Sequence, residues 1–500
     1  MRRALIVFVI LIVLGIGGVS FAHAALTAAQ DDVSFTETAS YGDVSAADGL
    51  TVSVRAQLKQ HLLWNTTHTF GSDGKTETDF VFSSKIFEWH LNYLREILSM
   101  NITTDYSATT SGGNLLSDNN EYSVPDNGFT SVRKILLDIA SRTQNGERHS
   151  EIVNFKDYYD YYDISAAMLP DEQYHFYYYT KNDGWSRYIT PYADETKIKE
   201  AFNNYFKIPV PYNHRIEVEI CKDIAGNVVG LSTMTLENSA WMQAYSVNTE
   251  NGIYFALQTM GITDFSGVNG GFGIYLLPAS TIVDDEGTQM PTLDFNNIST
   301  EHSLDESISV LGLDLSEDNS SLNLLTLEEG RLYLTVIELA TMSQKQKLPL
   351  FDNVSEPWLH TVKYTDGLLY ILLGDERFVL AELNEEGIYQ IALSYKRDIG
   401  LLNEELVAKG YYGSYEPFIS WDGERLAIVS ANQRFVPYDG SYSSGYSYAL
   451  CGFVLEIIDE SGLRYKGLYE SSLDMPPSRG GYGSDNMCFP VDPGGLSVYW

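Results

Sequence analysis

The pattern of hydrophobic and polar positions changes near Pro211. Before that residue, short alternating segments typical of half-buried strands lie among segments whose apolar residues recur every three or four positions, as in helices. After it, strand-like runs separated by glycines and acidic residues take over. The sequence therefore predicts a mixed α/β portion over residues 49–215 and a nearly all-β domain over residues 216–500.

The first portion is predicted to contain three strands followed by three helices. The strands carry Leu50, Val52, Val54 and Ala56, then Leu62, Trp64 and Thr66, then Phe80 and Phe82. The helices carry Phe87, Leu91, Leu94 and Leu98 up to Met100, then Val132, Ile135, Leu136 and Ile139, then Ile198, Ala201, Phe202, Tyr205 and Phe206. Residues 101–130, rich in Ser, Thr, Asn, Gly and Asp, are predicted to form a long loop.

An internal repeat indicates the architecture of the all-β domain over residues 216–500. Residues 378–387 (FVLAELNEEG) and 453–462 (FVLEIIDESG) are identical at five of ten positions. An acid-glycine turn followed by an apolar run recurs at Gly330, Gly367 and Gly423, at intervals averaging about 46 residues, which is the length of a four-stranded propeller blade. The third turn is followed by 19 extra residues, centred on residues 437–448.

A small sheet with apolar residues on both faces cannot bury them alone, but sheets stacked around an axis bury both. We therefore predict a mainly β fold, with a β-propeller-like domain of about six or seven blades preceded by a mixed α/β portion. The strands within residues 50–82 can supply one blade, because propellers often close by joining sequence from both ends. The alternative is a β-sandwich with a few similar hairpins.

The first residues carry an export signal. Arg2 and Arg3 precede an uncharged stretch over residues 4–22, and Ala22-His23-Ala24 has the small-x-small pattern of a cleavage site. Residues 1–24 are thus a signal peptide or, if residues 4–22 are not cleaved, a membrane anchor. Both alternatives predict an extracytoplasmic protein, secreted or tethered to the cell membrane, with residues 25–48 as a linker.

Composition narrows the function classes. Hydrophobic residues make up 44% of the chain, which excludes global disorder, and the net charge of −35 argues against nucleic-acid binding. Three cysteines are too few for a disulfide scaffold. Cys451 and Cys488 can pair in an oxidising compartment, and the alternative is two separate buried thiols.

No common catalytic pattern is present. The nine histidines form no HExxH or HxH motif, and GxSxG, P-loop and GxGxxG sequences are absent. We therefore expect no metal site and no cofactor, and the sequence leaves open whether the protein is an enzyme. The acidic runs at residues 284–287 and 317–319 can hold Ca²⁺, but neither has the spacing of a calcium loop, and solvated turns are the alternative.

Tyrosines are the candidate binding residues, because they combine a large stacking face with a hydrogen-bonding tip. They lie in residues 157–163 (DYYDYYD) and in the 19-residue insertion, where a loop on a rigid scaffold often carries function. The candidates are Tyr159, Tyr161, Tyr438, Tyr442, Tyr446 and Tyr448. The alternative is that they fill half-buried strands, for which tyrosine has a high propensity.

The chain resembles a set of uncharacterised bacterial extracytoplasmic proteins with one amino-terminal membrane or signal segment. The resemblance is carried by residues 49–52, 76–83 (TETDFVFS), 157–163, 225–230 (AGNVVG) and 420–429. It spans most of the mature chain and implies no activity. The hypothesis is a monomeric, non-catalytic cell-envelope module that binds a protein, peptide or glycan. The alternative is a secreted glycan hydrolase or lyase that uses propeller-face carboxylates.

Substituting both Tyr442 and Tyr446 with Ala is expected to weaken partner capture without unfolding the protein, because exposed loop tyrosines supply contact area rather than core packing. A pull-down from a cell-envelope extract, paired with a thermal unfolding curve, measures both effects. Unchanged capture by the double variant would contradict the assignment.

Overall fold

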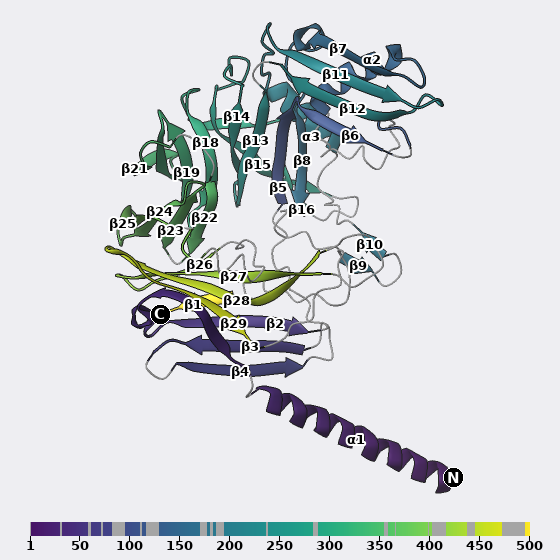
Figure 1. The fold of residues 1–500 in the computed structure, drawn as a ribbon. Helices are drawn as coiled ribbons and strands as arrows, with labels where there is room; N and C mark the ends of the chain where they lie inside the picture. Colours follow the sequence, from purple (N-terminus) through teal and green to yellow (C-terminus); the bar gives the residue numbers. More distant parts are fainter. Residues whose placement is uncertain are drawn as a thin grey trace.

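The computed structural model describes residues 2–30, 33–58, 62–71, 74–82, 96–110, 113–116, 130–170, 178–180, 184–186, 195–236, 239–283, 289–354, 359–365, 367–398, 400–402, 417–437, 446–472 and 496–500. Within these residues the chain is mainly β, as the sequence predicts, with antiparallel sheets and three α-helices. Figure 1 shows the larger sheets following one another along an arc. The fold is thus β-propeller-like.

Three of the sheets are four-stranded meanders, in which each strand pairs with the next one in sequence. Their strands are β18 (Ser309–Leu315), β19 (Ser321–Glu328), β20 (Arg331–Glu338) and β21 (Ser343–Phe351); β22 (Leu359–Thr365), β23 (Leu368–Leu373), β24 (Arg377–Leu383) and β25 (Tyr389–Lys396); and β26 (Phe418–Trp421), β27 (Leu426–Pro437), β28 (Tyr446–Asp459) and β29 (Gly462–Ser471). This meander is the unit of a propeller blade. The two repeated FVL segments lie on β24 and β28, in different sheets.

A further four-stranded sheet joins distant parts of the chain. It contains β2 (Thr51–Leu58), β3 (Leu62–Thr69), β4 (Lys75–Phe82) and β30 (Leu496–Tyr499), in the order β30-β2-β3-β4. The three strands predicted before Ser83 are therefore present, and β30 supplies the partner from distant sequence. A second long-range strand, β1 (Phe35–Gly42), pairs with β29 and becomes the fifth strand of the β26–β29 sheet.

Residues 25–48 are not the linker that the sequence predicts. Helix α1 (Arg2–Gln30) runs past Ala24, β1 pairs with β29, and the 3-10 helix η1 (Val44–Ala47) follows. The sequence did not predict strand β1, because Phe35 is its only buried side chain. An edge strand with one buried residue carries no alternating pattern.

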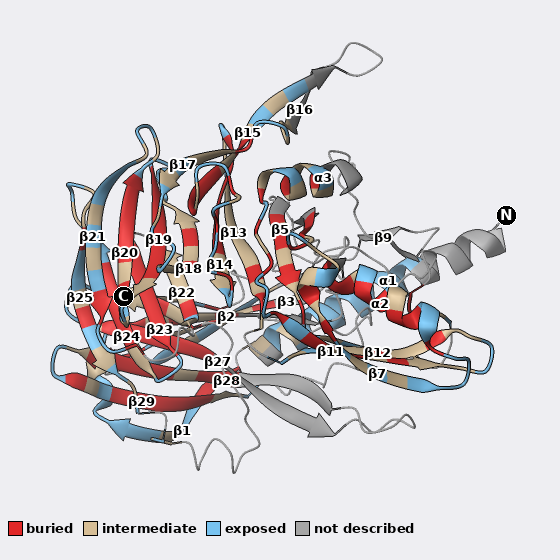
Figure 2. Ribbon diagram, turned by 90° about the horizontal axis from the view of Figure 1, so that it is seen from above, coloured by how far each residue is buried: buried red, intermediate tan, exposed pale blue. Residues whose placement is uncertain are grey.

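The three meander sheets are buried on both faces. One apolar cluster joins the β18–β21 sheet to the β22–β25 sheet, a second joins β22–β25 to β26–β29, and a third joins β26–β29 to β2–β4. We call the third cluster the long-range interface; Phe35 and residues 427–469 lie on one side, and residues 47–70 with Leu496 lie on the other. Figure 2 shows buried residues along the inner strands of these sheets and exposed residues along β1. Stacking thus hides both faces of each sheet, as the ring argument requires.

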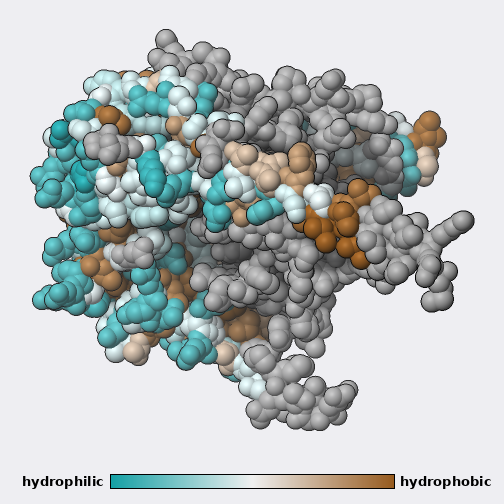
Figure 3. Space-filling view, turned by 90° about the horizontal axis from the view of Figure 1, so that it is seen from below, coloured by the Kyte–Doolittle hydropathy of each residue, from teal (hydrophilic) through white to brown (hydrophobic). Residues whose placement is uncertain are grey.

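Helix α1 projects away from the sheets (Figure 1). Among its described side chains, the apolar ones from Ile12 to Phe21 are exposed, and they form the hydrophobic patch beside the grey residues in Figure 3: Ile12, Val13, Leu14, Ile16, Val19 and Phe21. Of the side chains described in this helix, those in its last turns touch the body, where Leu26 packs near Trp64 and Phe80. Among the residues whose side chains the structure describes, no helix combines the length and apolar character needed to cross a membrane.

Two sheets draw strands from both sides of the predicted boundary between residues 215 and 216, so this boundary is not a division of the structure. The first contains β8 (Ser165–Pro170), β5 (Glu96–Thr103), β13 (Trp241–Thr249), β14 (Gly252–Met260) and β15 (Gly273–Val283), with β16 (Gln289–Leu293) and β17 (Ser299–Ser303) paired to β15. The second contains β6 (Tyr106–Thr109), β12 (Val228–Thr235), β11 (Arg215–Lys222) and β7 (Arg148–Asn154). A short hairpin is formed by β9 (Tyr178–Thr180) and β10 (Gly184–Ser186).

Two of the three predicted helices are confirmed, as α2 (Arg133–Arg142) and α3 (Glu195–Tyr205), with the 3-10 helices η2 (Thr130–Val132) and η3 (Phe155–Asp157) nearby. The helix predicted up to Met100 is wrong where the structure describes it, because residues 96–103 form β5. Leu98, Met100 and Ile102 are buried at every second position, the period of a strand. The predicted loop after Met100 likewise contains β6.

A buried group of charges joins the β22–β25 and β26–β29 sheets. Glu456 on β28 is only 4% exposed, and it accepts hydrogen bonds from Arg397 Nε at 2.9 Å and Lys466 Nζ at 3.0 Å. Burial acts to raise the pKa of Glu456, but the two cations outweigh it and hold that pKa below its ordinary value. Removing one member of such a group leaves uncompensated charge in the interior.

Glu456→Gln is expected to lower the free energy of unfolding at pH 7 by about 3 kcal/mol, because Arg397 and Lys466 lose their shared anion. The folded-state pKa of Glu456 is below its ordinary 4.5, so its contribution is present above that pH and disappears as the pH falls through the folded-state pKa. Urea unfolding of both proteins between pH 7 and pH 3 checks this: the stabilities should converge in acid. A gap that stays constant would contradict the assignment.

Candidate functional site

The 19-residue insertion extends the β27–β28 hairpin. Tyr446 and Tyr448 begin β28, where their backbones pair with Pro437 and Phe435. Tyr438 and Tyr442 lie outside the described residues. Two of the four candidate tyrosines are thus placed on the β28 arm of the hairpin, and partner binding by the insertion stays a prediction.

The tyrosine-rich segment at residues 157–163 is not a strand. It leaves η3 through a turn and meets Pro209 in a single β-bridge at Tyr161. Tyr159 turns inward: its ring stacks on Phe155 at 5.0 Å, and its hydroxyl accepts a hydrogen bond from the backbone N–H of Lys134 at 2.9 Å. Tyr161 is 47% exposed. Of these two candidates, only Tyr161 offers a free face.

The disulfide and calcium candidates fall mostly on residues that the structure does not describe. These are Cys488, the side chain of Cys451, and residues 284–287. Residues 317–319 belong to the β18–β19 turn, where Asp318 accepts hydrogen bonds from Ser316 and Ser320. In the described regions of the chain, no group of three or more His, Cys, Asp or Glu side chains is placed to hold a metal ion.

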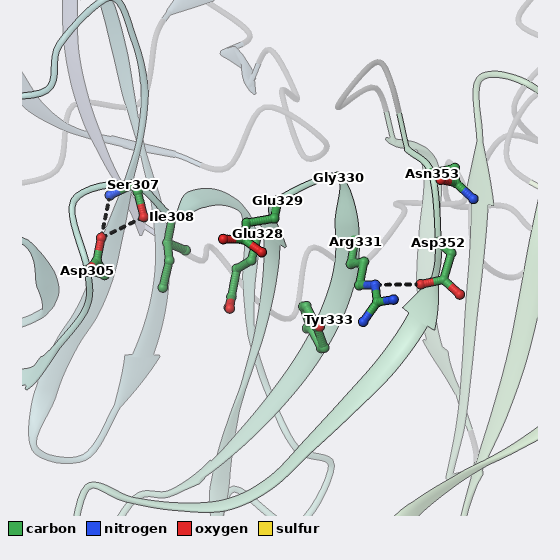
Figure 4. Close-up of a pocket in the computed structure, with 10 residues that line it drawn as sticks. All are labelled: Asp305, Ser307, Ile308, Glu328, Glu329, Gly330, Arg331, Tyr333, Asp352 and Asn353. Atoms are coloured by element: carbon green, nitrogen blue, oxygen red, sulfur yellow. Dashed lines mark hydrogen bonds and ion pairs between the residues drawn. The ribbon is translucent and has the colours of Figure 1, made fainter.

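A groove at one end of the β18–β21 sheet brings together residues that the sequence does not link. Three chain segments form it: the loop before β18, the turn between β19 and β20, and the residues after β21 (Figure 4). Alternate connections of an antiparallel meander lie at the same end of the sheet, which explains why they meet. The groove has a volume of about 1160 Å³ and is lined by Asp305, Ser307, Ile308, Glu328, Glu329, Gly330, Arg331, Tyr333, Asp352 and Asn353.

The β19–β20 turn places two carboxylates at the groove. Glu329 and Gly330 both have positive φ, 48° and 79°, as a two-residue type I′ hairpin turn requires. Gly330 adopts this conformation without steric cost, which is why the acid-glycine pattern predicted a turn here. Glu328 and Glu329 therefore stand side by side at the tip of a rigid hairpin.

The lining carries four carboxylates and one cation. Arg331 Nε lies 2.8 Å from Asp352 Oδ1 across the groove, as Figure 4 shows. Glu328 is paired with Lys347 Nζ at 2.6 Å, and Asp305 accepts hydrogen bonds from the Ser307 N–H and hydroxyl. Those hydrogen bonds lower the pKa of Asp305. The groove is therefore anionic at neutral pH.

The neighbouring sheet fixes one wall of the groove. Arg377, at the start of β24, donates to the backbone carbonyls of Asp352 at 2.7 Å and Asn353 at 3.3 Å. Its guanidinium also lies over the Phe351 ring. The wall is thus held by an adjacent blade rather than by its own loop alone.

The hydrolase alternative depends on one particular kind of carboxyl group. A glycosidase requires a carboxyl group with a raised pKa in an aromatic-lined pocket. Every described carboxyl group whose pKa departs clearly from its ordinary value is shifted downward: Glu37, Asp43, Asp105, Asp138, Glu151, Asp223, Asp264, Asp305, Asp318, Asp422, Glu456 and Asp459. Of these groups, Asp305 lines the groove, where hydrogen bonds from Ser307 favour its charged form and lower its pKa.

Sequence reasoning noted Glu329-Gly330 only as a turn and missed the groove. The signal that was available is an acidic residue at each of three alternate connections of one meander, at Asp305, Glu329 and Asp352.

No protein-family model and no curated protein matches the chain. The chain is similar to several solved structures, with low scores. A putative 6-phosphogluconolactonase from Bacteroides uniformis is 11% identical over 52% of this chain and 81% of that chain, with a TM-score of 0.23. The β-propeller domain of Nup133 from Vanderwaltozyma polyspora is 13% identical over 54% of this chain and 76% of that chain, with a TM-score of 0.25. An auxiliary nutrient binding protein from Bacteroides thetaiotaomicron is 10% identical over 88% of this chain and 82% of that chain, with a TM-score of 0.23.

These similarities include propellers, the class that the sequence predicts, and at such TM-scores they carry no argument about function. The description of the fold rests on the strand pairing given above. The resemblance to bacterial extracytoplasmic proteins is not tested by these matches and stays a prediction.

Tyr159→Ala is expected to lower the free energy of unfolding by about 3 kcal/mol, because it removes a stacked ring and leaves the Lys134 N–H without its acceptor. Tyr161→Ala, on the exposed side of the same segment, should change it by less than about 0.5 kcal/mol. Chemical denaturation of the two variants provides the comparison. Equal losses would show that the inward and outward orientations are wrongly assigned.

Proposed function

We propose that this protein is an exported, non-catalytic binding module whose anionic groove takes a cationic segment of a partner protein or peptide. The observation that carries the proposal is the convergence of Asp305, Glu328, Glu329 and Asp352 on one groove of about 1160 Å³. A groove of this size accommodates several side chains of an extended segment.

Electrostatics support a cationic partner. The chain has a net charge of −35, so a basic partner is attracted over a distance before it reaches the groove. Among the described residues that line the groove, Arg331 is the single cation, and it is already paired with Asp352. Charge complementarity of this kind selects partners and accelerates association. Nucleic acids and other polyanions are disfavoured for the same reason.

The contacts of α1 support export. His23 and Phe80 meet edge to face, Leu26 packs near Trp64, and Gln30 donates to the carbonyl of Thr78, so the contacts with the body lie at the end of the helix. Cleavage after Ala24 leaves Leu26 and Gln30 in place. The described side chains before Leu26 are exposed, so cleavage after Ala24 removes little packing from them beyond the contact of His23 with Phe80.

The double variant Glu328→Gln/Glu329→Gln is expected to weaken binding of a fluorescein-labelled lysine-rich peptide about tenfold, because it removes two groove charges and frees Lys347 to repel the peptide. Fluorescence anisotropy at about 20 and 200 mM NaCl measures the affinity, which should fall with salt.

The matched control is Glu385→Gln/Glu386→Gln. This pair removes the same charge from the exposed β24–β25 turn, at the opposite end of β24 from Arg377. The control should bind as the parent protein does. If both double variants weaken binding equally, the peptide responds only to net charge and the groove is not the site.

A further inference from the structure

Among the described residues, the backbone of strand β30 pairs with another strand along one edge only. It pairs antiparallel with β2, from Thr51 opposite Tyr499 to Val54 opposite Leu496, and no other strand pairs with it among the described residues. Four residues on a single edge make few main-chain hydrogen bonds. By contrast, β1 and β29 are paired over the whole length of β1.

Alternate side chains of this segment enter the long-range interface. Leu496 is 2% exposed within the interface cluster, and Val498 and Trp500 pack against the same cluster. Ser497 and Tyr499, between them, are exposed. Main-chain pairing to an edge with every second side chain buried is the geometry of strand addition, by which proteins bind extended peptides.

Trp500 is held by groups of the neighbouring sheet. The guanidinium of Arg425 lies 3.9 Å from the centre of its ring, and its indole N–H donates to the carbonyl of Ser420 at 3.3 Å. Arg425 is itself oriented by Asp422 and by a hydrogen bond to the carbonyl of Ala46 at 2.8 Å. The aromatic position therefore has its own prearranged partner, independent of β30.

We infer that residues 51–54 of β2, together with Ser420 and Arg425, form a binding site for an extended peptide with apolar residues at alternate positions and tryptophan at the last of them. We call it the β2 edge site. In the folded chain its occupant is the protein's own segment 496–500. Because that segment is held along one edge, the site opens by local unfolding while the stacked sheets persist, and it then accepts the same peptide from solution.

The test uses the full chain with a specific protease site placed between residues 479 and 484, and the uncut protein must unfold at the parent's temperature. After cleavage, the released segment is expected to stay bound and to exchange with a labelled synthetic peptide of residues 494–500 (GGLSVYW). Binding should be saturable, about tenfold weaker with Arg425→Gln, and absent for a peptide carrying Asp in place of Leu496.

Two outcomes would overturn the inference. In the first, segment 496–500 dissociates after cleavage and the rest of the protein still unfolds at the parent's temperature, which would show that the β2 edge needs no occupant. In the other, the cut protein unfolds and added peptide does not restore it, so the strand is not separable. Hydrogen exchange on the intact chain gives an independent reading, because β30 amides should exchange through local opening while β3 amides exchange only through global unfolding.

Discussion

The long-range interface between the β26–β29 and β2–β4 sheets is the contact on which the rest of the structure depends. Phe70, next to β3, packs edge to face against Tyr469 of β29 at 5.2 Å, and Phe35 of β1 meets His68 of β3 edge to face at 6.1 Å. Within the β26–β29 sheet, Glu37 of β1 accepts a hydrogen bond from Tyr465 of β29, 428 positions later in the chain. Burial opposes the charge of Glu37, but hydrogen bonds from Ser40 and two tyrosines outweigh it and lower its pKa. Without this interface, each of the two sheets would present an apolar face to water.

Stacking of the sheets also explains why the residues that line the groove hold fixed positions, although turns and loops carry them. The β18–β21 sheet is buried against neighbours on both faces, and Arg377 reaches from the next sheet to hold the carbonyls of Asp352 and Asn353. Binding groups carried on short connections of a rigid scaffold lose little conformational freedom when a partner arrives. At the next interface, between the β22–β25 and β26–β29 sheets, the buried charges around Glu456 have a similar effect, because they fix how the two sheets meet.

Local sequence patterns predicted the elements that depend on nearby residues. They failed where pairing with distant strands decides whether a segment is a helix or a strand. α2 and α3 each show a complete helical stripe, and the acid-glycine turns require positive φ at the glycine. Leu98, however, fits a helical spacing with Leu94 and a strand alternation with Met100 and Ile102, and only pairing with other strands decides between them. The sequence did not predict the groove, because its three segments meet only after the meander forms. The abundance of tyrosine indicates strand propensity, but it does not indicate which way each side chain points. The sequence therefore could not show that Tyr159 packs inward while Tyr161 is exposed.

The long-range interface requires β30 to lie beside β2, because Leu496 of β30 belongs to that interface, and a cross-link between these two strands tests the pairing most directly. Ser53 on β2 and Ser497 on β30 are directly opposed in the antiparallel register, and both side chains point away from the buried cluster. Opposed residues in such a pair are separated by a Cα distance that a disulfide spans. The full chain with Ser53→Cys and Ser497→Cys, oxidised and mapped by peptide mass spectrometry, should give one dominant cross-link between these positions. Absence of that cross-link, or equal yield from Ser53→Cys paired with Ser472→Cys, would contradict the arrangement.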